Sequence, residues 1–152
     1  MIYSRSAEYA IRGFIHMAAF EPGKYAMVKH IAAEAGIPAP FLAKILQDLA
    51  REGLLRSSKG PQGGFRLGRP AEEISLRHIV DAVDGAGRYE RCIGGSPECN
   101  DRAPCGLHDS WKALRSRIIE YLEDTSVADL AKALGEKRRR LARSRRRGLQ
   151  KT

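Results

Sequence analysis

All three cysteines of the 152-residue chain lie within one short segment, and this segment limits what the chain can fold into. Residues 92–108 read CIGGSPECNDRAPCGLH, and such a mixture of glycines, prolines and charged groups cannot form a packed helix or strand. The segment therefore predicts a loop between an N-terminal part and a C-terminal helical part. Three thiols and one imidazole within this loop also form a candidate set of metal ligands.

The N-terminal part has the spacing of three amphipathic helices, of which the last two are joined by a tight turn. Apolar residues at three-four spacing predict a first helix that Ser6 caps and that residues 21–23 end. Gly36 can adopt the left-handed conformation that a tight turn needs. This pattern favours a helix-turn-helix, although on its own it is equally compatible with a plain structural hairpin of helices.

A β-hairpin is predicted directly after the second helix of this motif, with strands over 54–58 and 65–67 and a connection over 59–64. A hairpin in this position is a wing, whereas a flexible surface hairpin is the alternative. The sequence thus predicts a mainly α fold with a small β-wing, a winged helix-turn-helix that binds DNA. The candidate DNA-contacting residues are Lys44 and Gln47 on the helix and Arg56, Ser58, Lys59, Gly63, Gly64 and Arg66 in the wing.

Helices are also predicted on both sides of the cysteine segment. A short helix begins near Ser75 and ends at residues 84–85, and the longest amphipathic helix begins near residue 107. The apolar stripe of this long helix could belong to the core, but we expect it to pack against the same helix of a second subunit in a homodimer. The stripe consists of Leu107, Trp111, Leu114, Ile118, Tyr121 and Leu122, and the last five are the candidate dimer contacts.

These patterns divide the chain into four parts. Residues 1–85 form the predicted DNA-binding domain, 86–106 the cysteine-rich loop, 107–135 the long helix and a short last helix, and 136–152 a basic tail. The tail is too charged and too poor in apolar groups to fold alone, so we expect it to be disordered and solvated. A contact with nucleic acid that does not depend on base sequence is the alternative for the tail.

Charge and composition limit the cellular setting and the class of function. The net charge of +9 divides into +5 over residues 1–69, −4 over 70–135 and +8 over 136–152. The cysteine number is odd, and neither a signal-peptide pattern nor a membrane-spanning apolar run is seen, so we expect a reducing, cytoplasmic location. No residue pattern points to catalysis, and we predict neither enzymatic activity nor a small-molecule substrate.

Several motifs in a fixed order resemble a known family. The motifs that carry the resemblance are GPQGGF at the wing, then AVDG, three clustered cysteines ending in CGLHDSW, a long helix and TSVADLA. In these motifs the chain is similar to bacterial regulators of the IscR and NsrR type, in the Rrf-two superfamily. The resemblance covers residues 1 to about 135. It implies a homodimeric transcription factor that binds double-stranded promoter DNA and senses iron–sulfur status, redox stress or nitric oxide through a two-iron or four-iron cluster.

The same resemblance implies a set of cluster ligands, namely Cys92, Cys99 and Cys105. Members of the family differ in the fourth ligand, which corresponds here to His108 or to Glu8. We favour His108 because it lies in the same local segment and needs no second subunit. Structural zinc sites usually have closer cysteine pairs than the five-residue and six-residue gaps found here. A regulator with zinc or redox thiols remains the alternative, and an electron-transfer protein is a further one.

The predicted recognition helix departs from the family more than the cysteine segment does. Some relatives place a glutamate on the outward face of this helix, and its counterpart here is Ala43. Prolines and alanines occupy most of the other outward positions. We therefore expect Lys44 and Gln47 to make the direct base contacts, while the wing and the shape of the DNA supply the rest.

Overall fold

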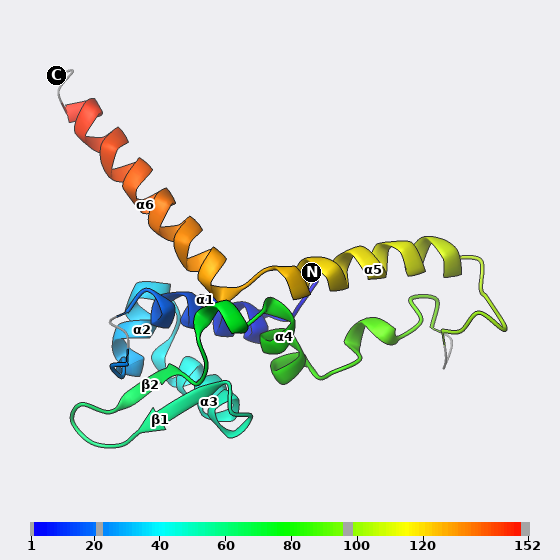
Figure 1. The fold of residues 1–152 in the computed structure, drawn as a ribbon, viewed down its shortest axis with the longest axis horizontal. Coiled ribbons are helices and arrows are strands. Elements are labelled where there is room, and N and C mark those ends of the chain that lie inside the picture. Colours follow the sequence, from blue (N-terminus) through cyan, green and yellow to red (C-terminus); the bar gives the residue numbers. More distant parts are fainter. Residues whose placement is uncertain (1, 21–22, 96–98, 150–152) are drawn as a thin grey trace.

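The computed structural model describes residues 2–20, 23–95 and 99–149. Within these ranges the chain forms six α-helices and one two-stranded antiparallel sheet, which lies at the edge of the molecule (Figure 1). The predicted fold class, mainly α with a small β-wing, is confirmed. In chain order the elements are α1 (Arg5–Ala18), α2 (Val28–Ala35), α3 (Ala39–Arg51), β1 (Leu55–Ser58), β2 (Gly64–Leu67), the 3-10 turn η1 (Ala71–Glu73), α4 (Leu76–Asp84), the 3-10 turn η2 (Arg88–Glu90), α5 (His108–Asp124) and α6 (Val127–Leu149).

Ser4 caps helix α1, so the prediction that Ser6 is the cap was wrong by two residues. The Ser4 hydroxyl accepts a hydrogen bond from the amide of Ala7 at 3.1 Å. The Ser4 amide donates to the carboxylate of Asp84 at 2.8 Å, and its hydroxyl donates to the same carboxylate. This long-range contact holds Ser4 in an extended conformation at the helix start, which the local sequence could not reveal.

Gly36 makes the predicted tight turn between α2 and α3. Its backbone is left-handed, with φ 66° and ψ 43°. The amide of Ile37 then donates to the carbonyl of Ala32 at 2.9 Å, which satisfies one of the last acceptors of α2. The side chain of Ile37 is only 6% exposed and joins Leu42 in the core. These contacts fix the crossing of the two helices of the helix-turn-helix.

The β-hairpin is anchored to the segment that precedes α2. Ser58 lies opposite Gly64 in the sheet, and Phe65 exchanges two backbone hydrogen bonds with Ala26, both of 2.9 Å. A Cβ on Gly64 would overlap the carbonyl group of Ala26, and the φ of this glycine is 144°. Glycine is needed here because two backbones meet closely. A free surface hairpin does not fit this anchoring, whereas a wing does.

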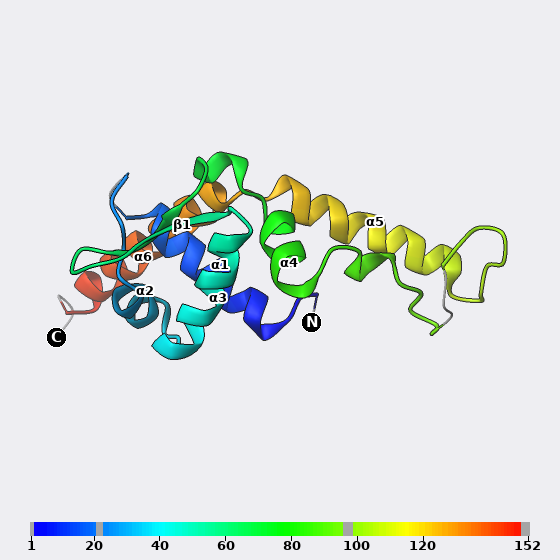
Figure 2. The same cartoon turned by 90° about the horizontal axis from the view of Figure 1, so that it is seen from below.

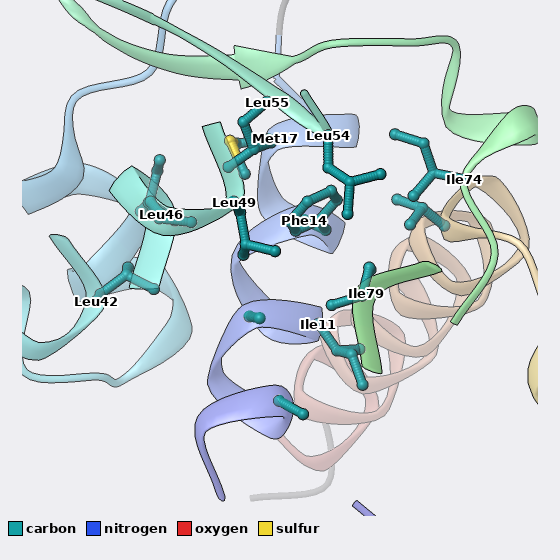
Figure 3. Close-up of a cluster of buried hydrophobic side chains, with 14 of the residues drawn as sticks. Ile11, Phe14, Met17, Leu42, Leu46, Leu49, Leu54, Leu55, Ile74 and Ile79 are labelled. Carbon is teal, nitrogen blue, oxygen red and sulfur yellow. The ribbon is translucent and has the colours of Figure 1, made fainter. Parts of the chain in front are cut away.

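The hydrophobic core lies where α1 passes between α3 and α4 (Figure 3). Phe14 of α1 is fully buried at its centre. Complete burial of an aliphatic or aromatic side chain of this size contributes about 1.5–3 kcal/mol to stability. The largest fully buried side chains are Phe14, Leu42, Leu46, Leu49, Leu55, Ile74, Ile79, Val80, Leu122 and Val127.

Two backbone hydrogen bonds join the start of α4 to the junction between α5 and α6. The amide of Leu76 donates to the carbonyl of Thr125 at 2.9 Å, and the amide of Val127 donates to the carbonyl of Ile74 at 2.8 Å. Leu122, near the end of α5, is fully buried beside this junction. The C-terminal end of α5 is therefore part of the packed winged domain.

Helices α5 and α6 leave the core in different directions (Figures 1 and 2). The first part of α6 packs on α1 and η1. Helix α5 extends to the opposite side and carries the cysteine loop at its far end, away from the wing (Figure 1). The molecule is thus elongated, with the helix-turn-helix and the hairpin toward one end of its long axis and the cysteine loop at the other (Figure 1).

The C-terminal segment differs from the sequence prediction of a short helix followed by a disordered tail. Helix α6 runs through Gly135 without a break and reaches Leu149. An ion pair of 3.2 Å between Arg138 and Glu34 ties the extension to α2. Alanine, leucine, lysine and arginine are good helix formers, and adding residues to an existing helix is far easier than starting one. The prediction of a disordered tail rested on the high charge of the segment and took no account of these helix propensities.

The substitution Gly135→Ala distinguishes the two descriptions of this segment. If α6 continues through residue 135, alanine stabilises the protein by about 0.5–1 kcal/mol, because it is the better helix former. If a helix ended at Leu134 with Gly135 as its left-handed cap, alanine would destabilise it. We expect a higher midpoint of thermal unfolding and a stronger far-UV helix signal. Gly106→Ala is a control outside any helix.

Candidate nucleic-acid interface and metal centre

Helix α3 presents the polar side chains that the sequence predicts for base contact. Lys44 and Gln47 are both exposed and lie one turn apart on the outward face. Phe41, in the first turn of α3, is 54% exposed. Its ring lies edge to face with that of Tyr9, with 5.9 Å between the ring centroids. The sequence reasoning had not included Phe41. An apolar ring beside a lysine and a glutamine can contact the methyl group of thymine in a major groove.

Among the contact residues predicted for the wing, three side chains are exposed to solvent and two glycines shape the backbone of the hairpin. Arg56, Ser58 and Lys59 are exposed along β1 and at the start of the turn. Gly63 is buried, and a Cβ there would overlap the carbonyl of Ser58. The glycines therefore shape the turn, while the three exposed residues can reach phosphate groups.

Arg66 is half-buried and takes part in the packing of the wing. Its guanidinium lies 4.8 Å from the centre of the Tyr25 ring, and Nη1 donates to the carbonyl of Gly23 at 2.9 Å. Stacking on an aromatic ring suits the planar guanidinium. The prediction named Arg66 as a phosphate contact. In the structure it has a clear role in holding β2 to the segment before α2.

The cysteine loop brings His108 and Cys99 together. His108 is the first residue of α5 and is only 5% exposed. Its Nδ1 lies 3.6 Å from the sulfur of Cys99, and its amide donates to the carbonyl of Cys105 at 2.9 Å. Asn100 turns the chain between these cysteines, because its side-chain oxygen accepts from two following amides at 3.1 Å. A thiol and an imidazole thus meet at the start of α5.

A carboxylate that the sequence prediction had omitted faces the other nitrogen of His108. Nε2 lies 2.8 Å from Oδ1 of Asp101, and the ammonium of Lys112 donates to both oxygens of this carboxylate at 2.8 and 3.0 Å. The hydrogen bond from Lys112 and, after it, the one from His108 lower the pKa of Asp101 to about 2. Asp101 is therefore an ionised acceptor at neutral pH.

Cys92 and Cys105 form a second pair of thiols around Gly94. A Cβ on this glycine would lie 3.6 Å from the Cys92 sulfur and 3.5 Å from the Cys105 sulfur. Both sulfurs therefore lie at van der Waals distance from the position of a side chain at residue 94. Three thiols and an imidazole in this arrangement fit an iron–sulfur cluster in donor chemistry. Among the described residues, no three histidine, cysteine or acidic side chains converge closely enough to hold a single metal ion.

Glu8, the alternative fourth ligand, lies in a different part of the molecule. It belongs to the first turn of α1 and pairs with Arg12, with 3.4 Å between Oε1 and Nη1. Arg12 also donates to the carbonyl of Ala35. Helix α1 is in the centre of the winged domain, whereas the loop lies beyond the far end of α5 (Figure 1). Glu8 could approach the loop only from a second subunit.

Four of the five residues predicted for dimerisation leave apolar surface on α5. Leu114 and Tyr121 are 52% and 51% exposed, and Trp111 and Ile118 are half-buried. The fifth, Leu122, is fully buried in the core of its own chain. Trp111 also donates to the carbonyl of Arg91 at 3.1 Å, which ties the loop back to α5.

These features define a class of protein. A helix-turn-helix with exposed polar residues on its second helix, followed by an anchored basic wing, is a winged-helix DNA-binding fold. The chain belongs to the Rrf2 family, described as iron-dependent transcriptional regulators, which it matches over residues 3–133. It is a transcriptional regulator that binds DNA, and the predicted resemblance to regulators of the IscR type is confirmed.

Individual relatives agree with this assignment. An HTH-type transcriptional regulator of Aquifex aeolicus is 33% identical over 132 residues, which cover 86% of this chain and 91% of that protein. The regulator IscR of Vibrio atlanticus is 29% identical over 132 residues, which cover 87% of this chain and 76% of that protein. Among solved structures, CymR, the global cysteine regulator of B. subtilis, is similar with a TM-score of 0.73 at 22% identity. The match covers 86% of this chain and 95% of the CymR chain. Within the described ranges, no helix has the length and apolar character of a membrane span.

Arg66→Ala should destabilise the wing, whereas Lys59→Ala should leave its stability unchanged. Loss of the stacking on Tyr25 and of the hydrogen bond to Gly23 is expected to cost about 1–2 kcal/mol. Lys59 is exposed and serves as the matched control. Thermal unfolding of the two variants measures the difference. Equal unfolding midpoints would show that Arg66 contributes nothing to the packing of the wing.

Proposed function

We propose that this regulator acts in the cytoplasm as a homodimer whose affinity for promoter DNA depends on an iron–sulfur cluster bound at the cysteine loop. The observation that carries the proposal is the 3.6 Å approach of His108 to Cys99, with the imidazole buried at the start of α5. The family description as iron-dependent regulators and the relative named IscR support it. The approach of both the Cys92 and the Cys105 sulfur to Gly94 also supports it.

Cys92, Cys99, Cys105 and His108 are the ligands that we propose. Thiolates suit iron–sulfur clusters, and an imidazole replaces a thiolate at some of them. Bound there, the cluster would supply a group that accepts electrons and is sensitive to oxidants, so its oxidation state or its presence could vary with conditions. We favour His108 over Glu8 as the fourth ligand, because His108 already lies beside Cys99 whereas Glu8 lies in the winged domain.

Helix α5 links the loop to the DNA-binding domain. His108 is both a proposed ligand and the first residue of α5, so ligation would fix where this helix begins. At its other end the helix is joined to α4 through the hydrogen bonds of Thr125 and Val127. A dimer must place its two recognition helices in successive major grooves, about 34 Å apart. An ordered loop would therefore hold α5 and the two winged domains at a defined spacing.

The exposed stripe on α5 supports the proposed homodimer. Leu107, which directly precedes α5, and Leu114 and Tyr121 within it are each more than half exposed and recur at seven-residue spacing. Side chains at this spacing lie on one face of a helix and are suited to packing against a second helix. The same helix of another copy offers an equivalent stripe, as a symmetric interface requires.

A regulator whose cysteines act as redox thiols or bind zinc is the second candidate. The contact between the Cys99 sulfur and an imidazole favours it as well, since a neighbouring imidazole can activate a thiol. The structural neighbour CymR is named as a cysteine regulator. Metal content therefore has to decide between these two functions.

Anaerobic purification tests the proposed cluster directly. We expect a brown protein with absorption in the visible range, stoichiometric iron and sulfide, and loss of both in Cys99→Ala. Arg102→Ala, an exposed position in the same loop, is the matched control and should keep the cluster. Gel filtration checks that each variant is a folded dimer. A colourless wild-type protein that contains zinc would contradict the proposal, and a complete cluster in Cys99→Ala would contradict the ligand set.

Lys44→Ala should weaken binding to operator DNA and leave the cluster intact. A lost base contact is expected to cost about 1–3 kcal/mol, or roughly five-fold to more than a hundred-fold in affinity. Lys132→Ala removes the same charge from an exposed site on α6 and is the control. Titrations at two salt concentrations separate a base contact from a phosphate contact, because only the latter changes the salt dependence. Unchanged affinity in Lys44→Ala would place the recognition surface elsewhere.

A further inference from the structure

Asp101 occupies a position in the cysteine loop that the proposed ligand set does not use. It lies between Cys99 and Cys105 in sequence, and its carboxylate is largely exposed, with 73% of the side chain accessible. Even so, it makes three close contacts, one with Nε2 of His108 and two with the ammonium of Lys112. These contacts give an otherwise solvated side chain a defined place.

We propose that Asp101 is a positioning residue for His108, which directs Nδ1 of the imidazole toward Cys99 and the cluster site. This inference rests on the proposed function. Its basis is that the two nitrogens of one buried ring face different partners, Nδ1 the Cys99 sulfur at 3.6 Å and Nε2 the Asp101 carboxylate at 2.8 Å. The two contacts leave the ring little freedom to turn.

The carboxylate also decides which nitrogen carries the proton. A neutral imidazole has one N–H donor and one acceptor nitrogen. A carboxylate can only accept, and Oδ1 of Asp101 lies 2.8 Å from Nε2, so the proton belongs on Nε2. The lone pair of His108 then lies on Nδ1, which is the nitrogen on the side of Cys99. Carboxylates that accept from ligating histidines fix the tautomer and ring orientation in other metal sites in the same way.

Lys112 holds the carboxylate in place. His108 and Lys112 are four residues apart on α5, so their side chains lie on the same face of its first turns. Asp101 binds both of them and therefore bridges the loop to this face. The bridge forms only where α5 begins at His108, which links the tautomer of the ligand to the start of the helix.

Cluster-free protein gives the first test, which does not depend on cluster binding. Histidine-selective NMR reports the tautomer of His108 at a pH where the ring is neutral, and the four histidines of the chain make the assignment by substitution simple. We expect the Nε2–H tautomer in the wild type and a mixture in Asp101→Ala. Asp109→Ala removes a carboxylate from the same helical turn without touching His108 and should resemble the wild type. The same tautomer in wild type and Asp101→Ala would overturn the inference.

Cluster-loaded protein gives the second test. The hydrogen bond to a carboxylate makes the imidazole a stronger donor and favours oxidised iron, so Asp101→Asn should raise the midpoint potential of the cluster. It should also release iron to a chelator about ten-fold faster or more. Asp109→Asn should change neither quantity. If Asp101→Asn matches the wild type while His108→Ala alters the spectrum, the positioning role is wrong. If the wild type binds no cluster, the proposed function fails, and the NMR result stands apart from it.

Discussion

The backbone hydrogen bonds between the start of α4 and the α5–α6 junction are the interaction on which the rest of the structure depends. They join Leu76 to Thr125 and Val127 to Ile74 at 2.9 and 2.8 Å. The packing of α5 on α4, with Ile118 and Ile119 against the core, adds to this attachment. With these contacts, and with Leu122 and Val127 fully buried, the direction of α5 is fixed relative to the recognition helix. A change at the loop can therefore reach the DNA-binding surface through a rigid element.

Local signals in the sequence predicted most of the winged domain. The left-handed Gly36, the apolar spacing of α3 and the glycine-rich hairpin each act within a few residues, so pattern reasoning found them. The cap of α1 was misplaced because Asp84, far along the chain, determines it. Long-range contacts of this kind leave no periodic signal, and the same holds for the stacking of Arg66 on Tyr25.

The candidate metal centre was predictable in its residue types but not in its geometry. Clustered cysteines with a following histidine indicated the donor set, and the resemblance to a family supplied the roles. The contact of Asp101 with His108 could not be inferred, since an aspartate in a polar loop is usually solvated. The length of α6 was missed for another reason: charge density argued against folding, while a docked first turn lowers the cost of extending the helix.

Distance constrains how the proposed regulation could operate. Helix α5 has 17 residues and is about 25 Å long at 1.5 Å per residue, and the loop lies at the end of this helix that points away from the wing (Figure 1). Direct contact between the loop and the DNA read by the same subunit is therefore an unsuitable mechanism. A tilt of about ten degrees along such a helix moves its far end by about 4 Å, close to one base-pair step. Small changes at the start of α5, where Asp101 bridges His108 and Lys112, would thus be sufficient to shift one recognition helix against its groove.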